Sequence, residues 1–105
     1  MGLKPTSVSL YGRTFPATSW KGVLLTVCEV VREKHPKEFN RVLSLRGRSR
    51  SYFSTDPGQL FKSAEVPGSN IHAETNLSAN DIARRCQEVL ELVGDDPATL
   101  QITAV

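Results

Sequence analysis

The stretch HAETNLSANDI, residues 72–82, contains the end of a strand and the start of a helix. Residues 71–75 alternate between apolar and polar side chains, which is the period of a strand. Asn76 can form an Asx-type turn. Ser78, followed three residues later by Asp81, resembles a capping box with aspartate in place of glutamate. We therefore predict a strand over residues 71–75 that turns directly into a helix capped by Ser78.

The predicted helix after this stretch has one apolar face. Its stripe consists of Ile82, Cys86, Val89, Leu90 and Val93. Residues three and four apart lie on the same face of a helix, so we expect this stripe to be buried. Asp81 and Arg85, four residues apart, are expected to pair on the outside. Gly94 is expected to follow the helix in the left-handed conformation that favours glycine.

A hairpin and a first helix are predicted ahead of this unit. Residues 7–11 alternate like a strand, and residues 14–17 return after a turn as a second short strand. Thr18 or Ser19 caps the helix that follows. The apolar residues at helical spacing are Trp20, Val23, Leu24, Val27, Cys28 and Val31. The helix is expected to stop at His35, because the residue before a proline avoids helical geometry.

The middle and the end of the chain offer shorter elements. Residues 36–43 fit a short helix that begins with a proline, and residues 51–54 fit a strand. Residues 60–66 are expected to be irregular, and residues 100–104 form a final strand. The side chains expected to face the core in these segments are Phe39, Val42, Leu43, Leu60 and Phe61.

The fold predicted from this order is a single α+β domain over residues 1–105. The elements follow one another as β-β-α-α-β-β-α-β, too irregularly for a doubly wound parallel sheet. A single mixed or antiparallel sheet of four to five strands, with the two main helices on one face, would bury both apolar stripes.

Composition restricts the class of protein. The chain has 105 residues, the size of one domain, and its 39% hydrophobic and 23% charged residues are typical of globular proteins. No apolar run approaches the roughly 20 residues of a membrane span. No signal-peptide pattern opens the sequence. We therefore predict a cytoplasmic protein with no membrane partner.

The cysteines and histidines do not form a metal-binding pattern. Zinc sites usually offer two ligands a few residues apart. Cys28, His35, His72 and Cys86 are instead widely separated. Both cysteines lie on apolar helix stripes, where a thiol behaves as a small hydrophobic group. We predict two buried core cysteines, no metal and no cofactor.

His72 and Glu74 are the candidates for catalysis, because they share one face of their predicted strand. Such a pair can act as acid and base. The sequence contains no nucleophile elbow and no Gly-rich phosphate loop, and a solvated strand face is the simpler interpretation. We therefore predict that the protein is not an enzyme. A small hydrolase or nuclease using these two residues is the least favoured function.

Positive charge is concentrated between Arg32 and Arg50, where seven basic residues accompany two acidic ones. Arg46, Arg48 and Arg50 would share one side of an extended chain, and Tyr52 follows on that side. Arginine binds phosphate oxygens through paired hydrogen bonds, and an aromatic ring can stack on an unpaired base or on a guanidinium. We predict a nucleic-acid-binding surface, DNA or RNA. Its residues are Lys37, Arg41, Arg46, Arg48, Arg50 and Tyr52.

A protein partner explains the same charge about equally well. The residues from Cys86 to the end of the chain include four acids and no base. These acids are Glu88, Glu91, Asp95 and Asp96. An acidic surface of this kind, in the same chain, on a second copy or on another protein, could dock the basic stretch. The alternative function is therefore a protein-interaction or oligomerisation module.

Two stretches resemble a small uncharacterised bacterial α+β domain found at the C-terminus of larger proteins linked to restriction or phage defence. They are TSWK, residues 18–21, and HAETNLSANDI running into RRCQEVL, residues 84–90. With the glycine-aspartate pair and the final strand, the resemblance covers about half of the chain. It implies an accessory module in a system that acts on nucleic acid. It carries over no catalytic residue.

Overall fold

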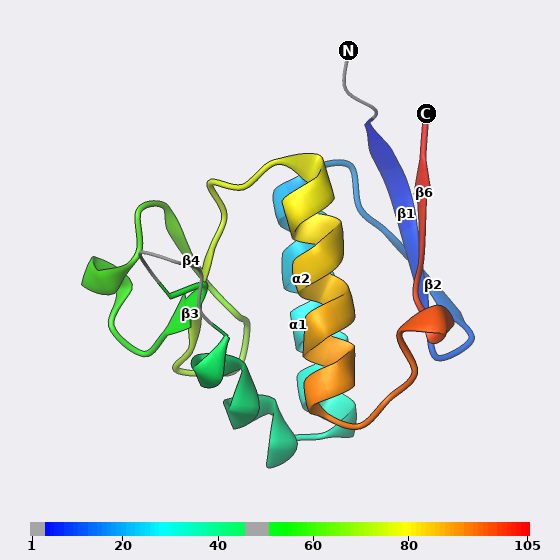
Figure 1. The fold of residues 1–105 in the computed structure, drawn as a ribbon. Helices are drawn as coiled ribbons and strands as arrows, with labels where there is room; N and C mark the ends of the chain where they lie inside the picture. Colours follow the sequence, from blue (N-terminus) through cyan, green and yellow to red (C-terminus); the bar gives the residue numbers. More distant parts are fainter. Residues whose placement is uncertain (1–3, 46–50) are drawn as a thin grey trace.

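Two separate sheets flank a central pair of helices in the computed structural model, which describes residues 4–45 and 51–105 (Figure 1). Within those ranges each sheet has three antiparallel strands, in the orders β2-β1-β6 and β3-β5-β4. The predicted α+β class is confirmed. The prediction of one sheet of four to five strands was wrong. The N-terminal hairpin pairs with the last strand, whereas the middle strands pair with one another.

The first sheet brings the two ends of the described chain together. Its strands are β1 (Pro5–Leu10), β2 (Arg13–Pro16) and β6 (Gln101–Ala104). Val8 of β1 pairs with Phe15 on one side and with Ile102 on the other. Tyr11 and Gly12 connect β1 to β2 with φ of 55° and 77°. Two consecutive positive φ values are what a two-residue type I′ hairpin turn requires.

The second sheet is small, and β5 lies in its middle. Its strands are β3 (Phe53–Ser54), β4 (Ser63–Glu65) and β5 (His72–Glu74). Ala73 pairs with Phe53 on one side and with Ala64 on the other. The strand β4 lies in the segment 60–66, which was predicted to be irregular. Since β3 and β4 both run antiparallel to β5, they run parallel to each other and begin at the same end of the sheet.

The first helix, α1 (Trp20–Lys34), begins and ends where the sequence predicted. Ser19 is the N-cap, and the backbone N–H of Gly22 donates to its hydroxyl oxygen across 3.0 Å. The helix ends at His35, whose N–H donates to the carbonyl of Val31. Its buried side chains are Val23, Leu24, Val27, Cys28, Val30 and Val31. The predicted stripe is therefore the face that packs into the core, with Trp20 at its margin.

The second helix, α2 (Ala79–Leu92), packs beside α1 and runs in the same direction (Figure 1). The N–H of Asp81 donates to the Ser78 hydroxyl oxygen across 3.2 Å, as the capping box predicted. Gly94 follows the helix with a φ of 87°, the left-handed conformation expected there. Cys28 and Cys86 are both free and buried between the helices and sheets, as predicted.

A 3₁₀ helix, η1 (Glu38–Ser44), occupies most of the segment predicted as the short helix 36–43. Phe39 and Val42 are buried, as expected. Leu43 was predicted to face inward, but its side chain is 36% exposed. A 3₁₀ turn has three residues per turn, so Phe39 and Val42 lie on one side and Leu43 leaves that side. Two further 3₁₀ turns are η2 (Pro57–Gln59) and η3 (Pro97–Thr99).

Two side chains occupy environments opposite to the ones predicted. Leu60 is buried as expected, but Phe61 is 72% exposed. Arg85, predicted on the outside of its helix, is only 6% exposed. A long-range contact explains the burial of Arg85, because its guanidinium packs over the ring of Tyr52. The exposed phenylalanine follows from the way its backbone is held, described below.

One buried cluster joins the two sheets and both helices. It includes Val8 and Leu10 from the first sheet and Phe53 and Ala73 from the second, and both helix stripes fill the space between them. Close packing across all these elements fixes the ends of the helices relative to the sheets. In the described residues, no helix is both long enough and apolar enough to pass through a bilayer.

Candidate functional site

The described residues include only part of the basic surface predicted from the sequence: Lys37, Arg41 and Tyr52. Lys37 and Arg41 are exposed, at the N-cap and in the middle of η1. Arg46, Arg48 and Arg50 lie outside the described residues. The residues on either side of that stretch lie next to each other, because the N–H of Tyr52 donates to the carbonyl of Leu45 across 3.2 Å. Leu45, at the end of η1, and Tyr52 are therefore neighbours in the fold.

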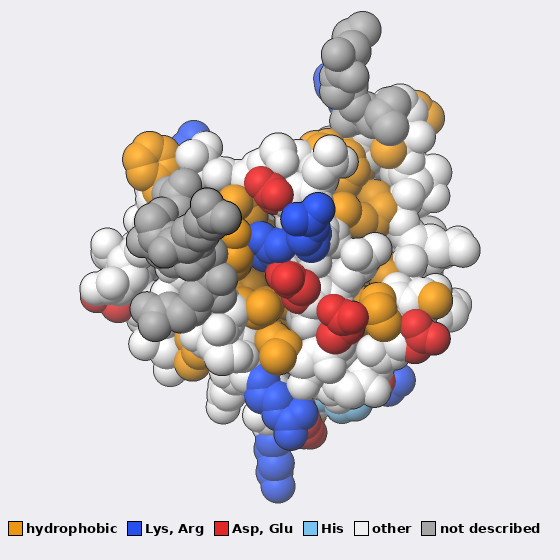
Figure 2. Space-filling model, viewed as in Figure 1, with side chains coloured by type: hydrophobic (Ala, Val, Ile, Leu, Met, Phe, Trp, Pro, Cys, Tyr) orange, Lys and Arg blue, Asp and Glu red, His pale blue; other side chains and the backbone are white. Residues whose placement is uncertain are grey.

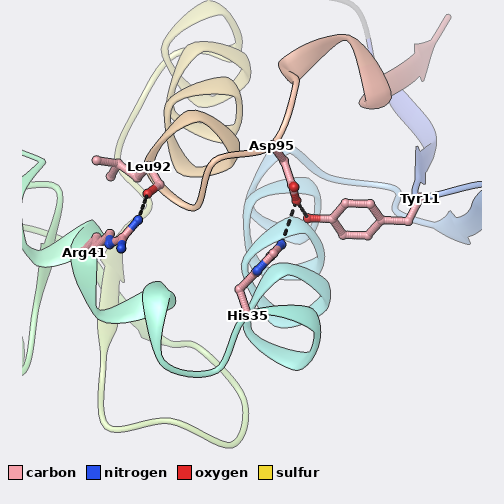
Figure 3. Close-up of polar contacts among 5 residues, drawn as sticks. All are labelled: Tyr11, His35, Arg41, Leu92 and Asp95. Carbon is pink, nitrogen blue, oxygen red and sulfur yellow. Dashed lines mark hydrogen bonds and ion pairs between the residues drawn. The ribbon is translucent and has the colours of Figure 1, made fainter.

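Arg41 contacts the end of the second helix. Its Nη1 donates to the backbone carbonyl of Leu92, the last residue of α2, across 2.9 Å (Figure 3). Carbonyls in the last turn of a helix have no partner inside the helix and carry partial negative charge. An arginine placed there is both held and electrostatically stabilised. The contact uses one of the five donors of the guanidinium, and the residue is exposed.

Tyr52 follows the basic stretch in the sequence and contacts Arg85 of α2. The guanidinium carbon of Arg85 is 4.3 Å from the centre of the Tyr52 ring, so one face of that ring already carries a cation. Nε of Arg85 also pairs with Oε1 of Glu88 across 2.5 Å. Of the stacking partners considered for Tyr52, a base or a guanidinium, the fold supplies a guanidinium. The predicted pairing of Arg85 with Asp81 is replaced by this pairing one turn later.

Acidic and basic side chains share the face drawn in Figure 2. Basic side chains gather at the lower end of this view, whereas acidic side chains lie in its middle and to the lower right, with further basic side chains among them. Glu91 and Asp96, near the C-terminal end of α2, are exposed. The described contact between the basic segment and this helix end is the bond from Arg41 to a backbone carbonyl. The exposed carboxylates of Glu91 and Asp96 and the guanidinium of Arg41 therefore all lie at the C-terminal end of α2.

A cluster that sequence reasoning missed joins Tyr11, His35 and Asp95 (Figure 3). The Tyr11 hydroxyl donates to Oδ2 of Asp95, and Nε2 of His35 lies 3.0 Å from the same oxygen. The hydrogen bond from Tyr11 is the largest influence that lowers the pKa of Asp95, and His35 and Lys34 add to it. Burial raises the pKa of the Tyr11 phenol, and the bond to Asp95 raises it further.

The same cluster has a structural explanation and a chemical one. It ties the first hairpin turn to the ends of both helices, which stabilises the fold. A carboxylate bound to a histidine ring nitrogen also orients that ring, as in many acid–base sites. The three residues come from segments far apart in the sequence. The available signals were the turn at Tyr11 and Gly12, and the aspartate that follows Gly94.

A surface pocket of about 260 Å³ lies beside Tyr11. It is lined by Tyr11, Arg13, Val30, Glu33 and Lys34. The ammonium of Lys34 sits 3.8 Å from the centre of the Tyr11 ring. Two cations and one carboxylate around an aromatic ring make the pocket mildly basic. It is too small and too mixed in charge to indicate a particular ligand.

Glu74, one of the two candidates for catalysis, is fully buried. The prediction of a solvated strand face was wrong, because β5 is the central strand and its carboxylate turns inward. The backbone N–H groups of Phe61 and Lys62 donate to Oε1 and Oε2 across 2.7 and 2.9 Å. The N–H of Asn76 donates to Oε2 across 3.0 Å. These bonds give Glu74 a structural role, while His72 beside it is half-buried.

No metal-binding cluster of three or more His, Cys, Asp or Glu side chains is present in residues 4–45 and 51–105. No protein-family model matches the chain, and no curated protein is significantly similar to it. The described residues offer two surface features with functional character. One is the pair of exposed basic residues of η1, Lys37 and Arg41, and the other is the Tyr11 cluster with its pocket.

Proposed function

We propose that the chain is a non-catalytic accessory module that binds nucleic acid through its basic segment. Lys37 and Arg41 on η1, with Arg46, Arg48 and Arg50, contact phosphates. Tyr52 contributes at the edge of the same surface. The resemblance of residues 72–90 to a bacterial domain linked to restriction and phage defence supports a place in such a system.

The exposure of Lys37 and Arg41 on one short helix carries this proposal. Their helix runs directly into the three arginines of the basic stretch. Phosphate oxygens are bound by arginine through two parallel hydrogen bonds and by lysine as a point charge. Basic residues clustered in one part of a sequence are typical of a surface that binds nucleic acid.

The anchoring of Arg41 on Leu92 supports the same proposal. A side chain held by one hydrogen bond loses less conformational entropy when its remaining donors bind a ligand. Arg41 thus has a defined position near the end of α2, where it is exposed. Phosphate contacts of this kind fix position and carry no sequence information, so we expect binding to nearly any sequence.

Binding is favoured over catalysis because the carboxylates of Glu74 and Asp95, the candidates for an acid or base, already accept hydrogen bonds within the fold. Both oxygens of Glu74 accept backbone N–H groups. Oδ2 of Asp95 is shared by Tyr11 and His35.

The test is fluorescence anisotropy with labelled single-stranded and duplex DNA and RNA at about 50 mM salt, where phosphate contacts are strong. One variant carries Arg46→Ala, Arg48→Ala and Arg50→Ala. A matched control carries Lys4→Ala, Arg13→Ala and Lys21→Ala, three exposed basic residues outside the segment. Both variants lose the same net charge.

We expect the first variant to lose affinity by at least about a hundredfold, and the control to stay within about threefold of the wild type. Equal losses in both variants would indicate a general effect of charge and would contradict a defined site. No binding by the wild-type protein would remove the proposal. The basic segment would then be tested against acidic proteins and for self-association.

A further inference from the structure

The strand β6 leaves one edge of the first sheet open. Of the strands that the structure describes, only β1 pairs with it, and no residue of β6 is buried. Lys4 and Val105 exchange both of their backbone hydrogen bonds, across 2.8 and 2.9 Å. Because bonded residues alternate along an antiparallel strand, the N–H and C=O groups of Ile102 and Ala104 point away from β1, towards the open edge.

The opposite edge of the same sheet is blocked. Directly after β2, the N–H of Ala17 donates to the carbonyl of Thr6 in β1, so the preceding residue, Pro16, faces outward. A proline has no N–H to donate to a further strand, and Arg13 adds a charge to β2. Natural sheets protect their edges with prolines, with charges and with very short strands. The sequence of β6, QITA, contains neither a proline nor a charge.

A second copy of this chain is the occupant that fits an uncharged edge of this kind. Identical strands carry identical charges, so two copies that meet at a charged edge repel each other. The edge strands of the second sheet are β3, which has two residues, and β4, which carries the exposed Glu65. Among the described edge strands, β6 is therefore the one that can pair with its own copy without repulsion.

From these features we infer that two copies of the chain pair through β6, antiparallel, and join their first sheets into one continuous sheet. The register that uses every outward-facing group of β6 places Ile102 opposite the partner's Ala104, where the two exchange both backbone hydrogen bonds. A large side chain then lies beside a small one, on the side of the sheet where Val8 is buried. Thr103 lies at the centre of this register, opposite the partner's Thr103, and such threonine pairs are favourable.

This inference does not depend on the proposed function. Figure 1 shows the first sheet and η1 on opposite sides of the helix pair. Pairing through β6 therefore leaves the exposed Lys37 and Arg41 of each copy outside the interface. Dimerisation is measured without nucleic acid, so its result and the result of the binding test are separate.

Cysteine substitution tests the register. In Thr103→Cys the two introduced thiols lie opposite each other, with Cα atoms about 4.5 Å apart, which a disulfide can span. Gln101→Cys is the matched control, exposed on the same face of the same strand. In the inferred register its two copies are about 13 Å apart along the strands, too far for a disulfide. The native Cys28 and Cys86 are buried and do not compete.

We expect Thr103→Cys to form at least about ten times more disulfide-linked dimer than Gln101→Cys under mild oxidation. Non-reducing gel electrophoresis measures the linked fraction. Equal linking of the two variants would show that the thiols meet by random encounter, and the inferred pairing would be wrong.

Sedimentation equilibrium over about 10 µM to 1 mM protein measures the association itself, which is expected to be weak because the interface is small. Thr103→Lys places two like charges opposite each other, and Thr14→Lys adds the same charge to the same face at the blocked edge. We expect a wild-type dissociation constant on the order of 100 µM, raised at least about fivefold by Thr103→Lys and less than about twofold by Thr14→Lys.

Two results of the sedimentation experiment would overturn the inference. A wild-type protein that stays monomeric over the whole range would leave a strand of another protein as the occupant of this edge. A dimer that forms equally well in Thr103→Lys would be held by a surface other than β6.

Discussion

The buried carboxylate of Glu74 accepts a hydrogen bond from the backbone N–H of Phe61, thirteen residues earlier in the chain, across 2.7 Å. Through this bond a charged group inside the fold determines the position of an exposed aromatic ring on its surface. Lys62 and Asn76 donate to the same carboxylate. One side chain thus holds the approach to β4 and the turn that leads towards α2.

Replacing Glu74 with glutamine should destabilise the protein substantially. The amide has a single acceptor oxygen, so at least one buried backbone N–H loses its partner. Each such loss costs about 1–3 kcal/mol, and the weaker neutral bonds add to it. We expect the free energy of unfolding of Glu74→Gln, from urea titration, to fall by about 2–4 kcal/mol. The exposed Glu65 in β4 provides the control, and Glu65→Gln should change stability by less than about 0.5 kcal/mol. A fully stable Glu74→Gln would mean that these bonds do not hold the loop.

The Asp95 cluster should make stability depend on pH in the acid range. The pKa of Asp95 is lowered in the folded protein, chiefly by the hydrogen bond from Tyr11. A lowered pKa means that the unfolded chain binds the proton more readily. The contribution of Asp95 is therefore complete above its ordinary value of 3.8 and is lost as the pH falls through the lower, folded value.

Thermal unfolding of wild type and Asp95→Asn across this range measures that contribution. The difference in stability should be constant near neutrality and shrink below the ordinary pKa of an aspartate. Tyr11→Phe removes the donor that lowers this pKa most. The difference in stability between Tyr11→Phe and wild type should therefore be smaller than that for Asp95→Asn and should shrink over the same pH range. A difference that stays constant at every pH would contradict the account of the cluster.

The two cysteines should be nearly inert in the folded protein. Burial raises the pKa of the Cys86 thiol to about 12. Burial also raises the pKa of Cys28, and the nearby Cys86 adds to that effect. The thiolate is the reactive species, so both should react with an aromatic disulfide reagent at least about a hundredfold more slowly than free cysteine. In urea both should react at the ordinary rate. Rapid modification without denaturant would show that the helices open readily at this point.

Variants at Arg41 and Lys37 should distinguish an effect on stability from an effect on nucleic-acid binding. Arg41→Gln removes the bond to the Leu92 carbonyl and should lower the free energy of unfolding by about 1 kcal/mol. Lys37→Gln, at the exposed N-cap of η1, should change it by less than about 0.5 kcal/mol. Each variant should weaken nucleic-acid binding to a similar extent for all sequences. Urea unfolding and anisotropy on the same samples test both expectations. A Lys37→Gln protein with unchanged affinity would place this residue outside the interface.

The local features of the fold could be predicted from the sequence, and the long-range ones could not. The helix caps at Ser19 and Ser78 and the left-handed Gly94 involve only residues nearby in the sequence. The local sequence is therefore sufficient to predict them. The choice between one sheet and two depends on which strands meet. The strands β1 and β6 are far apart in the sequence, and the residues of neither strand indicate that the two would pair.

The same reason explains the errors at individual residues. Arg85 is buried because Tyr52, from another element, covers its guanidinium, and Phe61 is exposed because Glu74 holds its backbone. Spacing along one segment carries no information about such contacts. For the candidate site, the sequence identified the basic residues of η1. It missed the cluster of Tyr11 and Asp95, which forms only when the hairpin and the end of α2 meet.

The dependence of binding on salt tests the central claim most directly. Each phosphate neutralised on a single strand contributes about 0.7 to the slope of log affinity against log salt concentration. Anisotropy titrations of the labelled single strand, from about 50 to 200 mM salt, give this slope. We predict saturable binding whose slope is smaller by about 2 when Arg46, Arg48 and Arg50 are replaced by alanine. An unchanged slope in that variant, or no binding by the wild type at the lowest salt, would contradict a phosphate-binding role for the basic segment.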